Sequence, residues 1–251
     1  MKTRAKPPVS ASLVWERPEP VSRPAPAALS RDRIVRAAIA IADKAGLGAV
    51  SLRKIGASLD AGPMRLYGYL STKEELLELM VDAVYGEMAS SEPAGSDWRE
   101  ALRSIAHRTR RAAQKHKWFI DLLGNRPHLG PNALANLEAS LAALGKTRGF
   151  ENIDDAMQAV ATVNAYVIGA IRGEASELRA EARSGMDQKA WQAAAWPYIQ
   201  RMLDTGRFPM IERVVRDATH PGADVVFERG LDCVLAGIEA KLPLKASAGP
   251  C

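Results

Sequence analysis

The chain has 251 residues, of which 47% are hydrophobic, so it is long enough to form one or two domains with a substantial core. Its two cysteines cannot build a disulfide framework, and no spacing of His or Cys is typical of structural zinc, so we expect no metal and no cofactor. The longest apolar run, residues 159–171, is too short to span a bilayer, and no secretory leader follows Met1. We therefore expect a cytoplasmic protein with no membrane partner.

Positive charge is concentrated at the N-terminal end. Residues 1–73 contain 13 Lys or Arg and five Asp or Glu, a balance of +8, whereas the other 178 residues contain 21 and 24, a balance of −3. A basic segment joined to a mildly acidic body is typical of a DNA-binding head on a second domain. Residues 1–29 are rich in proline and are predicted to be a disordered basic arm, which either follows DNA or carries incidental charge. Trp15 is the exception, because its ring favours packing against the body.

Two helices are predicted to follow the arm. Ser30 is a suitable N-cap for a helix over residues 33–45, where apolar residues recur at helical spacing, and Gly46 ends that helix. Ser51 caps the next helix. The sequence Asp-Ala-Gly-Pro at residues 60–63 ends this second helix, because Gly supplies a positive φ and Pro favours the first turn of a new helix.

A third helix of barely two turns is predicted after this break. It buries Leu66 and Leu70 and leaves its outer face to solvent. A short helix that its neighbour holds in this way is the geometry of a helix-turn-helix, in which the outer face enters a DNA major groove.

The remainder of the chain is predicted to be helical. Thr72 and Glu75 form a capping box for a helix that runs to about residue 88, and residues 90–96 mark a domain boundary. Further helices are expected over residues 98–115, 131–146, 152–182, 188–206, 209–218 and 223–241.

No strand-like alternation competes with these patterns, so the predicted fold class is all-α. We expect an N-terminal three-helix helix-turn-helix domain over residues 30–90, a C-terminal helical domain over residues 97–242, and a tail over residues 243–251.

Several stretches resemble the TetR family of transcriptional regulators. The first two helices of TetR-type repressors resemble LSRDRIVRAAIAIADKAGLGAVSLRKIG, and the end of their recognition helix and their fourth helix resemble RLYGYLSTKEELLELMVDAV. Leu66, Tyr67 and Lys73 match the family pattern, whereas Tyr69 and Leu70 replace its usual His and aromatic residue. The resemblance implies a homodimer that binds double-stranded DNA at a palindromic operator.

The resemblance also implies which residues contact DNA. The exposed positions of the recognition helix are Pro63, Met64, Arg65, Tyr67, Gly68 and Tyr69. Arg65 is suited to grip a guanine edge bidentately, and the apolar side chains in this set are suited to thymine methyl groups. Tyr67 and Lys73 match positions that bind phosphate in the family, and Arg53 is expected to do likewise. The alternative for Tyr67 is that its ring packs beneath the helix.

The second domain resembles that of the tetracycline repressors in the segment RPHLGPNALANLEASLAALGKTRGF. Those repressors have a His-Leu-Gly whose His binds the magnesium of the metal–drug complex, and His128 matches that residue. Ser140 replaces a Gln that bonds the drug. The resemblance implies a pocket for a small hydrophobic or aromatic effector, lined by His128, Asn132, Ser140, Tyr166 and Trp196. The alternatives are a surface role for His128 and ordinary core packing for the rings.

The last helix carries a stripe of small residues, Gly230, Cys233, Gly237 and Ala240. Such a stripe lets another helix approach closely. In the family the final helix and another long helix of each subunit form a four-helix dimer interface, and the alternative is packing within the monomer.

The sequence thus predicts a ligand-responsive repressor that its effector releases from DNA. We do not expect an enzyme, because four dispersed His offer no recognisable catalytic spacing. The alternative is a DNA-binding regulator that has no small ligand and is controlled by a protein partner.

Overall fold

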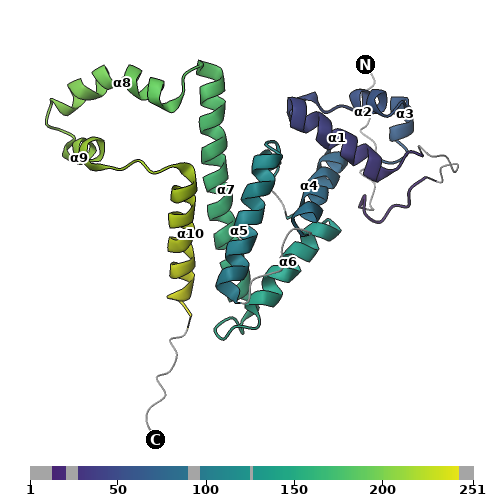
Figure 1. Cartoon of the computed structure of the whole chain (residues 1–251). Coiled ribbons are helices and arrows are strands. Elements are labelled where there is room, and N and C mark those ends of the chain that lie inside the picture. Colours follow the sequence, from purple (N-terminus) through teal and green to yellow (C-terminus); the bar gives the residue numbers. More distant parts are fainter. Residues whose placement is uncertain (1–12, 21–27, 90–96, 125–126, 243–251) are drawn as a thin grey trace, which may run out of the picture. The chain divides into compact units, whose positions relative to one another are not determined.

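The computed structural model describes residues 13–20, 28–89, 97–124 and 127–242, and every regular element in these ranges is helical (Figure 1). The α-helices are α1 (Arg31–Ala45), α2 (Leu52–Ser58), α3 (Pro63–Leu66), α4 (Lys73–Ala89), α5 (Trp98–Lys115), α6 (Pro131–Leu144), α7 (Ile153–Ser184), α8 (Gln188–Leu203), α9 (Pro209–Asp217) and α10 (Ala223–Glu239). Short 3-10 turns lie at Leu47–Ala49 and Phe119–Asp121. The predicted all-α fold class is confirmed.

Ser30 and Ser51, the expected N-caps, each accept a hydrogen bond from the first turn of their helix. Asp97 and Asp187 cap α5 and α8 in the same way. Thr72 accepts from the Glu75 amide at 3.1 Å, but the Glu75 carboxylate accepts from the Ser71 amide at 2.7 Å rather than from that of Thr72. The return hydrogen bond of the capping box therefore goes to the residue before the expected one.

The chain divides after Thr147 into two compact units, with α1 to α6 in the first and α7 to α10 in the second. In the first unit α4 packs against α1, α5 and α6. The domain limits expected from the sequence, 30–90 and 97–242, do not coincide with this division, because α5 and α6 bury apolar residues in the same unit as the head. The boundary expected at residues 90–96 lies outside the described residues.

The second unit contains two long helices that pack on each other, α7 (green) and α10 (yellow) in Figure 1. Their buried apolar residues include Val160, Val163, Val167, Ile171, Phe227, Leu231 and Leu235. Helices α8 and α9 also pack on each other, and none of the residues in these two fully described helices is buried. Within the part of the chain that the structure describes, no helix is long and apolar enough to cross a membrane.

The turn between α2 and α3 depends on a glycine. The backbone turns back toward α2 at Ala61, whose amide donates to the Gly56 carbonyl at 2.8 Å. Asp60, just before it, takes a positive φ of 51°. A Cβ built on Gly56 would overlap the carbonyl oxygen of Ala61. Because that atom belongs to the backbone, it cannot rotate away, and any side chain at this position must displace the turn.

Replacing Gly56 by Ala should therefore destabilise the head, at a cost of about 1–3 kcal/mol, as overpacking does elsewhere. Thermal unfolding followed by circular dichroism measures the effect. Gly48→Ala is the matched control, because no described atom lies within 4 Å of a Cβ at that position. Equal melting temperatures for the two variants would show that the turn tolerates a side chain.

Candidate functional site

The predicted recognition surface is exposed on the head. Met64 is 80% exposed and Tyr67 is 53% exposed. Also exposed are Arg53, Pro63, Arg65, Gly68 and Lys73. The Tyr67 ring therefore does not pack beneath the helix, which was the alternative for this residue.

A hollow of about 500 Å³ brings several of these residues together from three elements. Arg53 comes from α2, Pro63 from α3, and Lys73 from the first residue of α4, with Tyr67 between them. The hollow also contains the hydroxyl-bearing residues Ser51, Ser71 and Thr72. Two cations and several hydroxyl groups beside the start of a helix have the chemistry that holds a DNA phosphate.

Tyr69 is not part of this surface, so its predicted exposure is wrong. Its side chain is buried, and its hydroxyl donates to the Leu29 carbonyl at 2.9 Å. The reason is that α3 ends at Leu66, so the chain turns before residue 69 and does not continue the outer face of the helix. Tyr69 therefore joins the recognition turn to the residue before the Ser30 cap.

Part of the N-terminal arm is folded onto this turn. Among residues 13–20, Val14 is buried, and the Arg17 guanidinium binds Ser71 Oγ and the Glu75 carboxylate. Arg31 donates from Nη1 to the Arg17 carbonyl at 2.6 Å and from Nε to the Tyr69 carbonyl at 3.1 Å. The prediction of disorder is wrong for this segment, and residues 1–12 and 21–27 lie outside the described residues.

Sequence reasoning missed the contacts that Arg17 and Arg31 make with the recognition turn. Their local signal was only positive charge, which favoured solvent or DNA as the partner. The structure gives them protein partners on the recognition turn, so they hold Ser71 and the start of α4 in place.

His128 lies beside a smaller hollow of about 250 Å³ on α4. The hollow is lined by Glu74, Leu77, Glu78, Val81, Leu122, Pro127 and His128. Burial lowers the pKa of the His128 imidazole, and the nearby Glu78 charge opposes this effect only in part. The neutral ring is therefore favoured at neutral pH. Its Nε2 is shielded from solvent and has no hydrogen-bond partner among the described residues.

Asn132 is committed to a buried carboxylate instead of facing an open space. Its Nδ2 donates to Asp82 Oδ2 at 2.9 Å, and the Ala133 amide donates to Asp82 Oδ1 at 2.9 Å. Asp82 belongs to α4 and is 3% exposed, so α4 supplies the acceptor for the first turn of α6. A Cβ at Gly130 would overlap the Asp82 carboxylate, which explains the glycine before α6.

Tyr85, on α4, interacts with both His128 and Asp82. The Tyr85 ring lies 6.1 Å from that of His128 and 5.8 Å from that of Phe119, measured between centroids. Burial raises the pKa of the Tyr85 hydroxyl, and the Asp82 charge raises it further. Tyr85 is therefore neutral and able to donate a hydrogen bond across the whole physiological range.

The other predicted effector residues are bonded within the protein or lie elsewhere. Ser140 is buried, and its hydroxyl donates to the Asn136 carbonyl at 2.7 Å. In the second unit, Tyr166 donates to the Phe227 carbonyl at 2.7 Å, and Trp196 lines a hollow between α8 and α9. His128, Asn132 and Ser140 thus lie in the first unit, and Tyr166 and Trp196 lie in the second. His128 and Asn132 both lie against α4.

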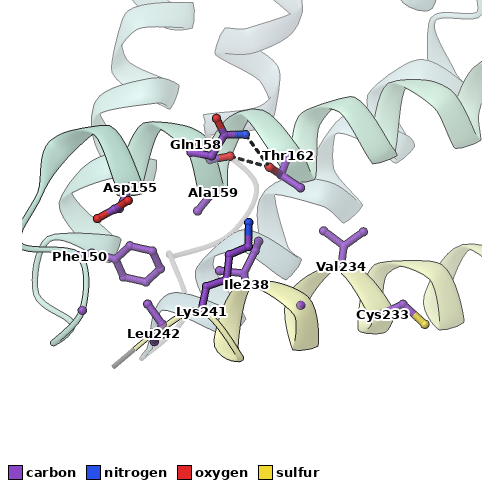
Figure 2. Close-up of a pocket in the computed structure, with 12 residues that line it drawn as sticks. Phe150, Asp155, Gln158, Ala159, Thr162, Cys233, Val234, Ile238, Lys241 and Leu242 are labelled. Carbon is purple, nitrogen blue, oxygen red and sulfur yellow. Dashed lines mark hydrogen bonds between the residues drawn. The ribbon is translucent and has the colours of Figure 1, made fainter. Parts of the chain in front are cut away.

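A further hollow of about 500 Å³ lies between α7 and α10. Figure 2 shows Gln158 and Thr162 on α7 facing Val234 and Ile238 on α10. The small-residue stripe is divided by this packing. Gly230 meets the Tyr166 ring, so it packs within the monomer, whereas no described atom lies within 4 Å of a Cβ at Gly237.

Comparison with known proteins relates these features to one family. Residues 91–242 match the family described as "Tetracyclin repressor-like, C-terminal domain". The HTH-type transcriptional repressor DrrR1 of Streptomyces coeruleorubidus is 34% identical over 231 residues, which is 90% of this chain and 83% of that protein. The class C tetracycline repressor protein of Escherichia coli is 27% identical over 218 residues, covering 84% of this chain and 91% of the repressor.

Solved structures agree with these relatives. Apo ActR from Streptomyces coelicolor superposes with a TM-score of 0.72 at 26% identity, covering 88% of this chain and 98% of ActR. ActR in complex with actinorhodin gives a TM-score of 0.72 at 26% identity, covering 87% of this chain and 99% of ActR. These structures share the helical fold over nearly the whole of their length.

The exposed head surface yields a prediction about DNA. Arg65→Ala should relax the base preference at one position of each half-site, because it removes a bidentate donor worth about 1–3 kcal/mol of discrimination. Lys73→Ala should weaken binding to all sequences alike and reduce the salt slope by about one counterion. Salt titrations with operator and random duplexes separate the two effects. Lys189→Ala is the control, since it removes an exposed cation from α8 in the second unit. Wild-type binding by both Arg65→Ala and Lys73→Ala would place the interface elsewhere.

Proposed function

Because the chain belongs to the tetracycline-repressor-like (TetR) family of transcriptional regulators, we propose that it is a homodimeric repressor released from a palindromic operator by a small organic effector. The observation that carries the DNA-binding part is the hollow in which Arg53, Tyr67 and Lys73 meet beside the exposed Arg65. Phosphate contacts by the first three position the head, and Arg65 reads a base edge. Two such heads in a two-fold dimer require half-sites about one helical turn apart.

The proposed route of release runs through α4. The N-terminal end of α4 carries Lys73, and farther along it Asp82 accepts hydrogen bonds from the first turn of α6. An effector bound beside His128 changes the loop that leads into α6. Because Asp82 fixes that turn to α4, the change moves α4 and the head with it, and the two heads no longer match adjacent grooves.

The chemistry around His128 supports an aromatic or hydrophobic effector with a polar group. Leu77, Val81 and Leu122 supply an apolar wall, and the neutral imidazole offers one polar atom with no protein partner. Binding pockets combine apolar walls with a few polar groups in this way. ActR, one of the similar structures, has been solved with actinorhodin and with (S)-DNPA. A protein-controlled regulator with no small ligand is the second candidate, and the effector experiment distinguishes the two.

The proposed dimer interface is the open side of the α7–α10 pair. Gly237 lines the hollow between the helices together with Val234 and Ile238, and no described atom lies within 4 Å of a Cβ at this position, which leaves room for a partner helix. Small residues with an apolar flank allow close helix packing.

The effector prediction concerns release. A compound found by thermal-shift screening should lower operator affinity about 5–150-fold, and operator DNA should weaken binding of that compound by the same factor. His128→Ala should weaken compound binding but leave operator affinity unchanged, and His220→Ala, in an exposed loop, is the matched control. A stabilising compound that leaves operator affinity unchanged, or no stabilising compound at all, would favour control by a protein partner.

A separate experiment tests whether the effector is magnesium–tetracycline. Magnesium–tetracycline should not bind tightly, because Ser140 lacks the amide donors of the Gln that it replaces and its hydroxyl is bonded to Asn136. Isothermal titration calorimetry decides this. Tight binding that disappears in His128→Ala would make the protein a tetracycline sensor.

The dimer prediction uses Gly237. Gly237→Trp should dissociate the dimer and abolish high-affinity operator binding, because the ring has room in its own chain but not against a partner helix. Gly237→Ala adds only a methyl group and serves as the control. Sedimentation velocity measures the oligomeric state. A dimeric Trp variant would place the interface on another surface.

A further inference from the structure

A buried histidine connects three helices of the first unit. His116 is the residue that caps the C-terminal end of α5, and it is 2% exposed. Its Nδ1 lies 2.8 Å from Asp43 Oδ1, and its Nε2 lies 3.1 Å from Glu87 Oε2. Asp43 belongs to the head helix α1, and Glu87 belongs to the last turn of α4. One imidazole therefore joins α1, α4 and α5.

The two carboxylate oxygens are also held from other directions. Trp118 donates from Nε1 to the same Asp43 oxygen at 2.7 Å, and Lys115 Nζ lies 2.6 Å from the same Glu87 oxygen. The charged groups that face the imidazole are thus Asp43 from α1, Glu87 from α4 and, through Glu87, Lys115 from α5. Each of these contacts pairs a nitrogen with a carboxylate oxygen, so the cluster is a polar link between α1, α4 and α5.

The geometry specifies the protonation state of the ring. Ionised carboxylates only accept hydrogen bonds, so both nitrogens of His116 must donate, and only the imidazolium has two N–H groups. Burial acts to raise the pKa of Glu87, but hydrogen bonds and charges from Lys115 and His116 outweigh this effect, and the pKa is lowered. Glu87 is therefore ionised at neutral pH. A neutral imidazole would direct a lone pair at one of the two carboxylates.

We propose that the His116 imidazolium is a positioning residue for operator binding, which holds the head helix α1 against α4 and α5 and whose loss of a proton lowers operator affinity. The inference rests on DNA binding by the head and not on the effector site. Helix α1 packs against α2, which carries Arg53, so the link bears directly on where a phosphate-binding residue lies. A head whose orientation varies fits the DNA major groove for a smaller fraction of the time, so it binds the operator more weakly.

The sign of the pH dependence follows from the two partners. Only the imidazolium can donate to both carboxylates, so one of the two bonds is lost when the ring loses its proton. The Glu87 bond is present above the ordinary pKa of a glutamate and is lost as pH falls through its lowered value. Operator affinity should therefore be lower once the ring is neutral.

The test compares operator affinity in wild type and in His116→Gln at constant ionic strength, between about pH 5 and about pH 8. The glutamine is neutral throughout, so it should bind operator about fivefold or more weakly at the acid end and should not show the wild-type decline. His220→Gln is the matched control, since it removes an exposed imidazole and should keep the wild-type profile. The same profile in wild type and His116→Gln would overturn the proposal.

Two further measurements decide the case even where His116→Gln folds poorly. Asp43→Asn removes one charge but leaves an oxygen for Trp118, and it should shift the pH profile of operator binding while keeping the fold. Nitrogen-15 NMR of the wild-type imidazole should show both nitrogens protonated at about pH 7. A neutral ring at that pH, or an unchanged profile in Asp43→Asn, would show that His116 has only a packing role.

Discussion

Helix α4 is enclosed by its neighbours, and the behaviour of the first unit depends on that enclosure. Its buried residues are Leu76, Leu79, Met80, Val81, Asp82, Val84 and Met88. These positions do not form a single stripe, as they would on a surface helix, because α1, α5 and α6 all pack against α4. Protein interiors are close-packed, so a helix in this position cannot move without changing its contacts with all three neighbours. A change at α6 therefore reaches the head.

Two polar connections, each with one buried side chain, give this packing a specific geometry. Asp82 joins α4 to the first turn of α6, and the His116 cluster joins the end of α4 to α1 and α5. Apolar packing alone allows helices to slide by small amounts, whereas a buried polar side chain that loses its partners, here the Asp82 carboxylate or the His116 imidazole, has a large desolvation cost. The two connections therefore restrict α4 to arrangements in which both are satisfied. Such discrete alternatives are what a switch between a DNA-bound and a released state requires.

Much of this fold could be predicted from the sequence because its signals are local. Ser30, Ser51, Asp97 and Asp187 each sit next to the helix that they cap, and the predicted breaks lie close to the observed helix ends. Tyr69 was placed wrongly because its exposure depends on where α3 stops, which a helical pattern does not specify. The partners of Asp82 and His116 lie 29 to 73 residues away in the chain. No periodicity within one segment indicates such pairs, so the polar connections appear only in the folded structure.

The second unit exposes large apolar side chains on two of its helices. Large apolar side chains on α8 and α9 remain exposed in the single chain, among them Trp191, Trp196, Tyr198, Met210, Ile211 and Val214. Monomeric proteins rarely expose so much apolar surface, and proteins of this family bind their operators as dimers. If a second subunit covers part of this surface, dimer formation and the stability of the unit are one equilibrium that depends on protomer concentration. The spacing of the two heads is then defined only in the dimer, so a movement of α4 acquires its regulatory meaning only there.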